Sequence, residues 1–131
     1  MGVRYLLDTH VFLWLLGQPT ALPEPLLEDL ARPEHDLLVS AVSAMEVATK
    51  VRLGKLEPAR HLVDTWAARV RDLQAHDLPL STEHALLAGS LPWSHRDPFD
   101  RLLVAQALVE NLTLVTSDTV MSEIAGLRLR W

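Results

Sequence analysis

The sequence predicts a single α/β domain built on a mainly parallel sheet of about five strands. Short apolar, β-prone segments alternate along the chain with segments whose apolar residues recur at helical spacing. No repeat, linker or low-complexity stretch divides residues 1–131. A domain of this length buries about two-thirds of the surface that its unfolded chain exposes. It therefore needs no disulfide or structural metal to fold.

Each of the five expected strands is a short apolar run bounded by turn or cap residues. They cover residues 3–7, 36–40, 75–80, 112–116 and 127–129. The first strand ends at Asp8, so that it delivers an acid into the following turn. Because helices separate the strands, we expect a parallel sheet that is covered on both faces.

Four helices are expected in the first half of the chain. A short one follows the first strand, and the next begins at Pro23, since proline is tolerated in a first helical turn. The third begins at Ser43 and ends at Gly54, a residue type that commonly ends helices. The fourth has the clearest helical spacing, over residues 59–73, and its apolar stripe places Trp66 in the core.

Three further helices are expected in the second half. Ser81 caps a helix that ends near Gly89. After a loop over residues 91–96, a longer helix runs from an Asp-Pro cap at residue 97 to Asn111. A short helix over residues 119–125 precedes the last strand.

Composition excludes several classes of protein. The chain has no cysteine, which excludes thiol catalysis, zinc–thiolate sites and disulfides. The longest apolar run, residues 11–16, is too short to span a bilayer. The first residues lack the basic and apolar regions of a signal peptide. We therefore expect a cytoplasmic protein without membrane association.

The net charge is −5, from 17 acidic and 12 basic residues, which argues against broad electrostatic adhesion to nucleic acid. Five acids stand at the ends of expected strands or the starts of expected helices: Asp8, Glu46, Asp97, Asp100 and Asp118. Without them, 12 acids balance the 12 bases, so the net charge equals this one group. Two divalent ions bound there would remove most of the objection to an anionic substrate.

Taken singly, each of these acids is explained as a helix cap. Residues 43–46 fit a capping box, in which Glu46 would reach back to the Ser43 amide. Residues 97–100 supply a capping aspartate, a proline and an acid in the first turn. Asp8 and Asp118 each precede a threonine at which a helix can begin.

Taken together, the acids favour a metal site. The carboxyl ends of parallel strands lie at one edge of the sheet, so the acids converge there. Three or four carboxylates repel one another unless a hard cation neutralises them. Since oxygen ligands dominate, Mg²⁺ or Mn²⁺ is the expected ion. Such an ion would orient a water and offset charge on a phosphodiester.

Four segments carry a resemblance to a known family. They are LLDTH at residues 6–10, SAMEV at 43–47, HRDPFDR at 95–101 running into AQA at 105–107, and LVTSD at 114–118. In this order and at these separations they resemble the four acidic motifs of PIN domains, and most of all the VapC-type toxins of toxin–antitoxin pairs. HRDPFDR is the most specific of the four.

The resemblance implies a compact α/β/α sandwich and Mg²⁺- or Mn²⁺-dependent endoribonuclease activity that leaves a 3′-hydroxyl and a 5′-phosphate. It also implies a homodimer, or a larger toxin–antitoxin assembly. Inhibition would come from a cognate antitoxin whose C-terminal segment covers the acidic pocket.

Carried over by position, the resemblance makes Asp8 and Asp100 the metal ligands. Glu46 matches the second acid, which helps to position the metal or water, and Asp118 matches the fourth and most variable acid. These four are the expected catalytic residues. Asp97 belongs to the HRDPFDR string, and we expect it to cap the helix and support the site.

Other polar residues flank the expected site. Thr9, Thr116 and Ser117 either bind water, carboxylate or phosphate or serve as turn and cap residues. Lys50 either contacts the scissile phosphate or pairs with Glu46 one helical turn away. Arg96 and Arg101 are expected to guide RNA.

One tryptophan and two histidines leave alternatives open. Trp93 either stacks on a base or packs against the protein. His10 and His95 are candidates for proton transfer, although a metal-activated water already provides a nucleophile.

A PIN-like fold that only binds or dimerises stays open as an alternative to the nuclease. A phosphoaspartate receiver requires paired acids near the first strand. A haloacid dehalogenase-type phosphatase requires an aspartate where this chain has His10. Both fit poorly. No motif encodes the RNA target.

Overall fold

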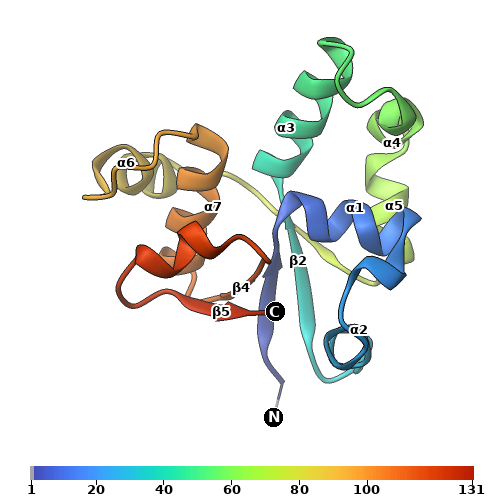
Figure 1. Ribbon diagram of the computed structural model, residues 1–131, viewed down its shortest axis with the longest axis horizontal. Coiled ribbons are helices and arrows are strands. Elements are labelled where there is room, and N and C mark those ends of the chain that lie inside the picture. The colour runs from blue at the N-terminus through green and yellow to red at the C-terminus, as the bar shows by residue number, and fades with distance from the viewer. Residues whose placement is uncertain (1) are drawn as a thin grey trace.

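The computed structural model describes residues 2–131 and confirms the α/β fold class (Figure 1). Five strands form one sheet in the order β3-β2-β1-β4-β5, and every neighbouring pair is parallel. The strands are β1 (Arg4–Leu7), β2 (Asp36–Ser40), β3 (His76–Leu78), β4 (Thr113–Val115) and β5 (Arg128–Arg130).

Helices connect these strands and cover the sheet. The α-helices are α1 (Thr9–Gly17), α2 (Glu24–Leu30), α3 (Ala41–Arg52), α4 (Arg60–Asp64), α5 (Trp66–Asp72), α6 (Thr82–Ser90) and α7 (Pro98–Val109). The short 3₁₀ helices are η1 (Pro19–Ala21), η2 (Glu57–Ala59) and η3 (Thr119–Glu123). Within residues 2–131, no helix combines the length and apolar character that a membrane crossing requires.

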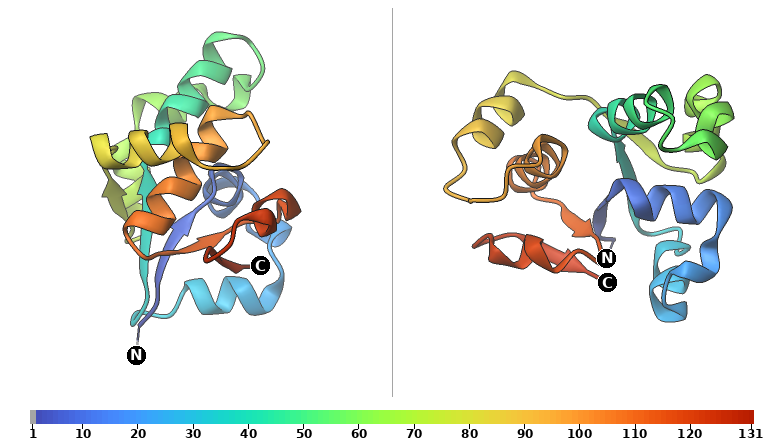
Figure 2. Two further views of the ribbon diagram at one scale, coloured as in Figure 1. Left: turned by 90° about the vertical axis from the view of Figure 1, so that its left-hand side faces the viewer. Right: turned by 45° about the horizontal axis from the view of Figure 1, so that its top comes forward.

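Two hydrophobic cores lie on opposite faces of the sheet. Tyr5 and Leu7 of β1 point into the core formed with α1, α2 and α5, whereas Leu6 points into the core formed with α7. This alternation is the two-residue period of a strand that is buried on both sides. Helices accordingly flank the sheet on both sides in Figure 2, which is the expected α/β/α sandwich.

The predicted ends of two helices are confirmed. Gly54 follows α3 with a φ of +73°, and its N–H donates to the Val51 carbonyl at 3.0 Å. The N–H of Lys55 donates to the Lys50 carbonyl at 2.8 Å, which completes a Schellman motif. Asn111 follows α7 in the same left-handed region, with a φ of 57°.

The single helix expected over residues 59–73 is wrong, because the chain breaks at Thr65 into α4 and α5. The Thr65 hydroxyl donates to the His61 carbonyl at 2.7 Å, and its φ of −122° is not helical. A threonine that bonds back to the preceding turn competes with regular helix geometry. Trp66 then packs on Phe12, with ring centroids 4.9 Å apart, at the edge of the core.

The third helix begins earlier than predicted. Ser40, rather than Ser43, caps α3, because its Oγ accepts from the Val42 N–H at 2.9 Å. Ser43 is therefore inside the helix, fully buried, with its Oγ 2.8 Å from Oγ1 of Thr9. The capping box proposed for residues 43–46 is wrong, and Glu46 has no capping role.

The order of the strands fixes where a site can form. The chain builds β2 and β3 on one side of β1 and then returns to build β4 and β5 on the other. In open parallel sheets, ligands bind outside the carboxyl ends of the strands where the order reverses. Here that point lies between the ends of β1 and β4, where Asp8 and Thr116 follow.

Asp29 ties α2 to the sheet at a distance from this edge. The Tyr5 hydroxyl donates to Oδ2 of Asp29 at 2.6 Å, His35 Nε2 lies 3.1 Å from Oδ1, and Arg130 Nε lies 3.7 Å from Oδ2. The hydrogen bond from Tyr5 is the main cause that holds the pKa of Asp29 below its ordinary value, against an opposing effect of burial.

Replacing Asp29 by asparagine (D29N) is expected to lower the free energy of unfolding by about 1–2 kcal/mol at pH 7, because bonds to a charged acceptor stabilise more than neutral ones. Since the folded pKa is lowered, the carboxylate's contribution is complete above the ordinary pKa of 3.8 and is lost as the pH falls through the folded value. Urea unfolding at pH 7 and pH 3 measures both effects. The exposed neighbour Glu28, changed to Gln, is the control, and a D29N effect of the same size at pH 3 would contradict this account.

Candidate metal centre

Asp8 is buried where β1 ends, with 9% of its surface exposed. Its carboxylate accepts from the Thr9 N–H and from the Thr116 hydroxyl, each at 2.7 Å. Burial raises the pKa of Asp8, the two hydrogen bonds oppose that effect, and the nearby charge of Glu46 adds to it. The carboxylate is thus fixed from the ends of two strands while another negative charge lies close by.

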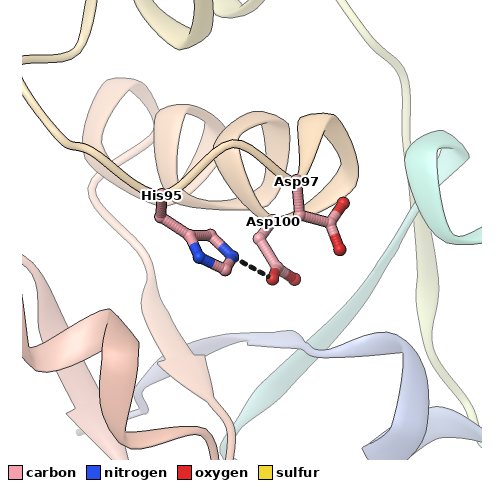
Figure 3. Close-up of side chains that lie close together, drawn as sticks. All are labelled: His95, Asp97 and Asp100. Carbon is pink, nitrogen blue, oxygen red and sulfur yellow. Dashed lines mark hydrogen bonds and ion pairs between the residues drawn. The ribbon is translucent and has the colours of Figure 1, made fainter.

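Asp100 lies in the first turn of α7 beside two other possible ligands (Figure 3). His95 Nε2 is 2.7 Å from Asp100 Oδ2, and the two side chains point toward each other. One ligand atom from each of His95, Asp97 and Asp100 lies within 4.8 Å of the others. Asp97 also caps α7, as predicted, by accepting from the Phe99 N–H at 2.9 Å.

The electrostatics connect Asp100 with Asp8. The pKa of Asp100 is raised first by burial and then by the negative charges of Asp97 and Asp8, while His95 acts in the opposite direction. Because Asp8 also responds to Glu46, the carboxylates at the end of β1, on α3 and on α7 act on one another. Of the four expected acids, Asp8 thus lies within electrostatic reach of both Glu46 and Asp100.

Glu46 is a buried acid with one cationic partner. It is 7% exposed, and Lys50 Nζ lies 2.7 Å from its Oε2. Of the two roles left open for Lys50, the structure shows the ion pair. The ammonium group of Lys50 offsets the cost of burying this carboxylate.

Asp118 occupies a different environment. Its exposed carboxylate caps η3 by accepting from the Val120 N–H at 3.1 Å. Its backbone N–H donates at 3.0 Å to Oγ1 of Thr116, the residue whose hydroxyl binds Asp8. Asp118 is thus connected to the acids through Thr116, while its carboxylate has the capping role. Ser117, also exposed, lies in the same turn.

Comparison with known proteins identifies the family. The family model of the PIN domain matches residues 5–127. The chain belongs to the PIN domain family. This confirms the resemblance carried by the four acidic motifs.

Solved structures share the fold of this PIN domain. VapBC2 from Rickettsia felis, bound to a DNA fragment from its promoter, matches with a TM-score of 0.72 and 21% identity over 98% of both chains. VapBC-1 from nontypeable Haemophilus influenzae matches with a TM-score of 0.69 and 18% identity over 98% of this chain and 97% of the other. FitAcB from Neisseria gonorrhoeae gives 0.64 and 21% over 95% of both. A search of curated proteins finds no match.

The donor set of this PIN domain fits a hard divalent cation. The ligand atoms are carboxylate oxygens with one imidazole nitrogen beside them, which suits Mg²⁺ or Mn²⁺ better than softer metals. Burial is the main cause of the raised pKa values of Asp8 and Asp100, and the negative charges of neighbouring carboxylates add to it. A cation is the group that would reverse this effect.

Gln106, the middle residue of the AQA segment, holds two of the acid-bearing helices together. Gln106 of α7 is fully buried and accepts a hydrogen bond from the hydroxyl of Ser40, the residue that caps α3. Glu46 lies on α3 and Asp100 on α7, so this bond fixes their two helices to each other. In the sequence, the signal for this role is a polar residue on an otherwise apolar helix face.

Arg101 has a different role from the expected guidance of RNA. Its guanidinium donates to the carbonyl oxygens of Ala88, Leu91, Trp93 and His95, at 2.7 to 2.9 Å. It therefore holds the segment over residues 91–96 against the start of α7. That segment includes His95, the partner of Asp100.

Trp93 packs rather than presenting a face to a base. It is 9% exposed, and its indole N–H donates to Glu123 at 3.0 Å. Its ring centroid lies 4.8 Å from that of His95. Trp93 therefore helps to orient His95 from within the core.

Replacing Arg101 by methionine is expected to lower the free energy of unfolding by about 2–4 kcal/mol, because four carbonyl groups lose a charged donor. Amide hydrogen exchange over residues 91–96 should become faster. Lysine at this position restores only part of the stability, since an ammonium group has three donors and cannot reproduce the guanidinium fork. The matched control is exposed Arg96→Met. Equal stability of the Arg101 and Arg96 variants would contradict the assigned role.

Proposed function

We propose that this PIN domain is a Mg²⁺- or Mn²⁺-dependent endoribonuclease and the toxin of a toxin–antitoxin pair. The observation that carries the proposal is the position of Asp8 where the strand order reverses, together with the cluster of His95, Asp97 and Asp100 at the start of α7. PIN domains are generally nucleases, and this acid set provides what metal-assisted hydrolysis of a phosphodiester needs.

The role proposed for each residue follows from its surroundings. Asp8 and Asp100 would hold the metal: Thr9 and Thr116 orient the first carboxylate, and His95 orients the second. Glu46, paired with Lys50, would accept a hydrogen bond from the attacking water and so orient it. Asp118 completes the rim of the site. A bound Mg²⁺ supplies polarisation of that water and neutralises charge on the phosphate.

Water attack would break the bond between phosphorus and the 3′ oxygen. The products are a 3′-hydroxyl and a 5′-phosphate. The acids act on the phosphodiester group, which every nucleotide linkage shares. They therefore account for cleavage but not for selection of an RNA sequence.

The proposed partners are a cognate antitoxin and a second copy of the chain. The structural neighbours support the antitoxin, because they include VapBC systems and a toxin–antitoxin complex from Klebsiella pneumoniae. An antitoxin that covers the acidic edge would inhibit cleavage by excluding RNA from it.

The nuclease proposal is tested by incubating antitoxin-free protein with a panel of RNAs. Cleavage is expected with Mg²⁺ or Mn²⁺ and not with excess EDTA. Asp8→Asn and Asp100→Asn should each reduce the rate at least about 100-fold, since loss of a metal ligand costs at least as much as loss of its supporting residue. Asp64→Asn, an exposed acid of α4, should cleave at the wild-type rate. Cleavage that resists EDTA, or an active Asp8 variant, would contradict the proposal.

Metal binding itself is measured by calorimetry with Mn²⁺. Wild type and Asp64→Asn should bind the ion, Asp8→Asn should not, and His95→Ala should bind about 10- to 100-fold more weakly because Asp100 loses its orienting partner. A protein that binds Mn²⁺ but cleaves no RNA would instead support the non-catalytic PIN-like module.

A further inference from the structure

A buried chain of hydrogen bonds runs from the end of β2 through α7 to α6. The Ser40 hydroxyl donates to Oε1 of Gln106. Nε2 of Gln106 lies 3.4 Å from Nδ1 of His84 and donates to the Pro79 carbonyl at 3.3 Å. Nε2 of His84 is 2.9 Å from Oε2 of Glu110. Ser40 and Gln106 are fully buried and His84 is 2% exposed, so water has little access to the bonds between them.

This buried chain begins beside one proposed metal ligand and continues on the helix that carries the other. The parallel register of β1 and β2 places Ser40, at the end of β2, alongside Asp8, at the end of β1. Gln106 follows Asp100 on α7 by six residues, which is about 9 Å along the helix. The bond between Ser40 and Gln106 therefore ties the helix of Asp100 to the sheet edge of Asp8.

His84 stands where the capping box of a helix usually has glutamate or glutamine. Its Nδ1 accepts from the Ser81 N–H at 3.0 Å, and the Ser81 hydroxyl accepts from the His84 N–H at 3.1 Å. Nδ1 therefore carries no proton, and the proton of the neutral ring lies on Nε2, from which it is donated to Glu110. The imidazole thus closes the cap of α6 and also binds α7.

The tautomer of His84 determines the orientation of the Gln106 amide. The lone pair on Nδ1 faces the NH₂ group of Gln106, which leaves the amide oxygen to accept from Ser40. A reversed amide would direct its oxygen at the Pro79 carbonyl and at the Nδ1 lone pair, and neither of these is a donor. His84 therefore fixes which end of Gln106 meets the sheet.

We propose that His84 is a positioning residue of the metal centre, although it contacts none of the acids there. It acts through Gln106, by holding α7 and with it Asp100 at a fixed separation from Asp8. This rests on the proposed metal-dependent function and adds a residue outside the four acidic motifs to it. Metal ligands must be held close to their productive geometry, so loss of an outer supporting residue weakens metal binding.

Mn²⁺ calorimetry tests the proposal by comparing wild type with His84→Gln. Glutamine keeps the capping box of α6, since its side-chain oxygen can accept from the Ser81 N–H. It lacks the second ring nitrogen with which His84 reaches Glu110. The dissociation constant for Mn²⁺ should rise at least about fivefold. Glu83→Gln, which alters the exposed neighbour in the same turn, is the matched control and should bind the ion as wild type does.

A pair of substitutions at Glu110 tests the chain without changing a buried residue, because this side chain is 37% exposed. Glu110→Gln retains an oxygen that accepts from Nε2 of His84, so Mn²⁺ affinity should stay within about twofold of wild type. Glu110→Leu removes the acceptor and should weaken Mn²⁺ binding at least about threefold. This pair decides the question if His84→Gln does not fold.

NMR of protein labelled with ¹⁵N at histidine measures the tautomer directly. The signals that disappear in Glu110-intact His84→Gln belong to His84, and in wild type they should be those of a neutral ring protonated at Nε2. A ring protonated at Nδ1 would overturn the proposed role of His84, because Nδ1 could then accept from neither Ser81 nor Gln106.

The outcomes separate this inference from the proposed function. If wild type binds Mn²⁺ and cleaves RNA while His84→Gln and Glu110→Leu bind the ion equally well, the inference fails and the nuclease stands. Variants that unfold at lower urea concentration but keep wild-type Mn²⁺ affinity also overturn it, since the role is then structural. If wild type binds Mn²⁺ without cleaving RNA and the variants bind it more weakly, the inference stands and the nuclease fails. If wild type binds no Mn²⁺, both proposals are wrong.

Discussion

The buried carboxylate of Asp8 is the constraint on which the rest of the site depends. An ionised carboxylate away from water is strongly destabilising unless hydrogen bonds or opposite charges compensate it. Here the compensation comes from a backbone N–H that follows β1 and a hydroxyl that follows β4. Those two groups are neighbours only because the strand order reverses at β1. The topology of the sheet therefore determines how the Asp8 carboxylate is held.

The other acids reach the same edge on helices that are fixed by buried polar contacts. The hydroxyls of Thr9 and Ser43 join α1 to α3, which carries Glu46. Gln106 joins α7, which carries Asp100, to the cap of α3. These contacts are short, buried and between regular elements, so they position the carboxylates more firmly than loops would.

Features governed by local physics were predictable from the sequence. The strand runs, Asp8 at the end of the first strand, the Asp97 cap and the glycine that ends α3 all depend on residues close in the chain. Features governed by distant neighbours were not. Gln106 acts through the hydroxyl at the end of β2, and Arg101 acts through carbonyl groups that only the folded loop presents. The family motifs predicted four site acids, and the Asp-Thr pair predicted the cap at Asp118, but neither predicted that Glu46 is buried.

The hydrogen bond between Thr116 and Asp8 joins residues 108 positions apart. Closing so long a loop is entropically unfavourable, and pairing distant parallel strands is slow. A chain emerging from a ribosome presents Asp8, Glu46 and Asp100 before it presents β4. A chain synthesised only as far as α7 thus contains all three acids but lacks β4, the strand that precedes Thr116. The edge that carries the acids is therefore assembled only after β4 has been synthesised.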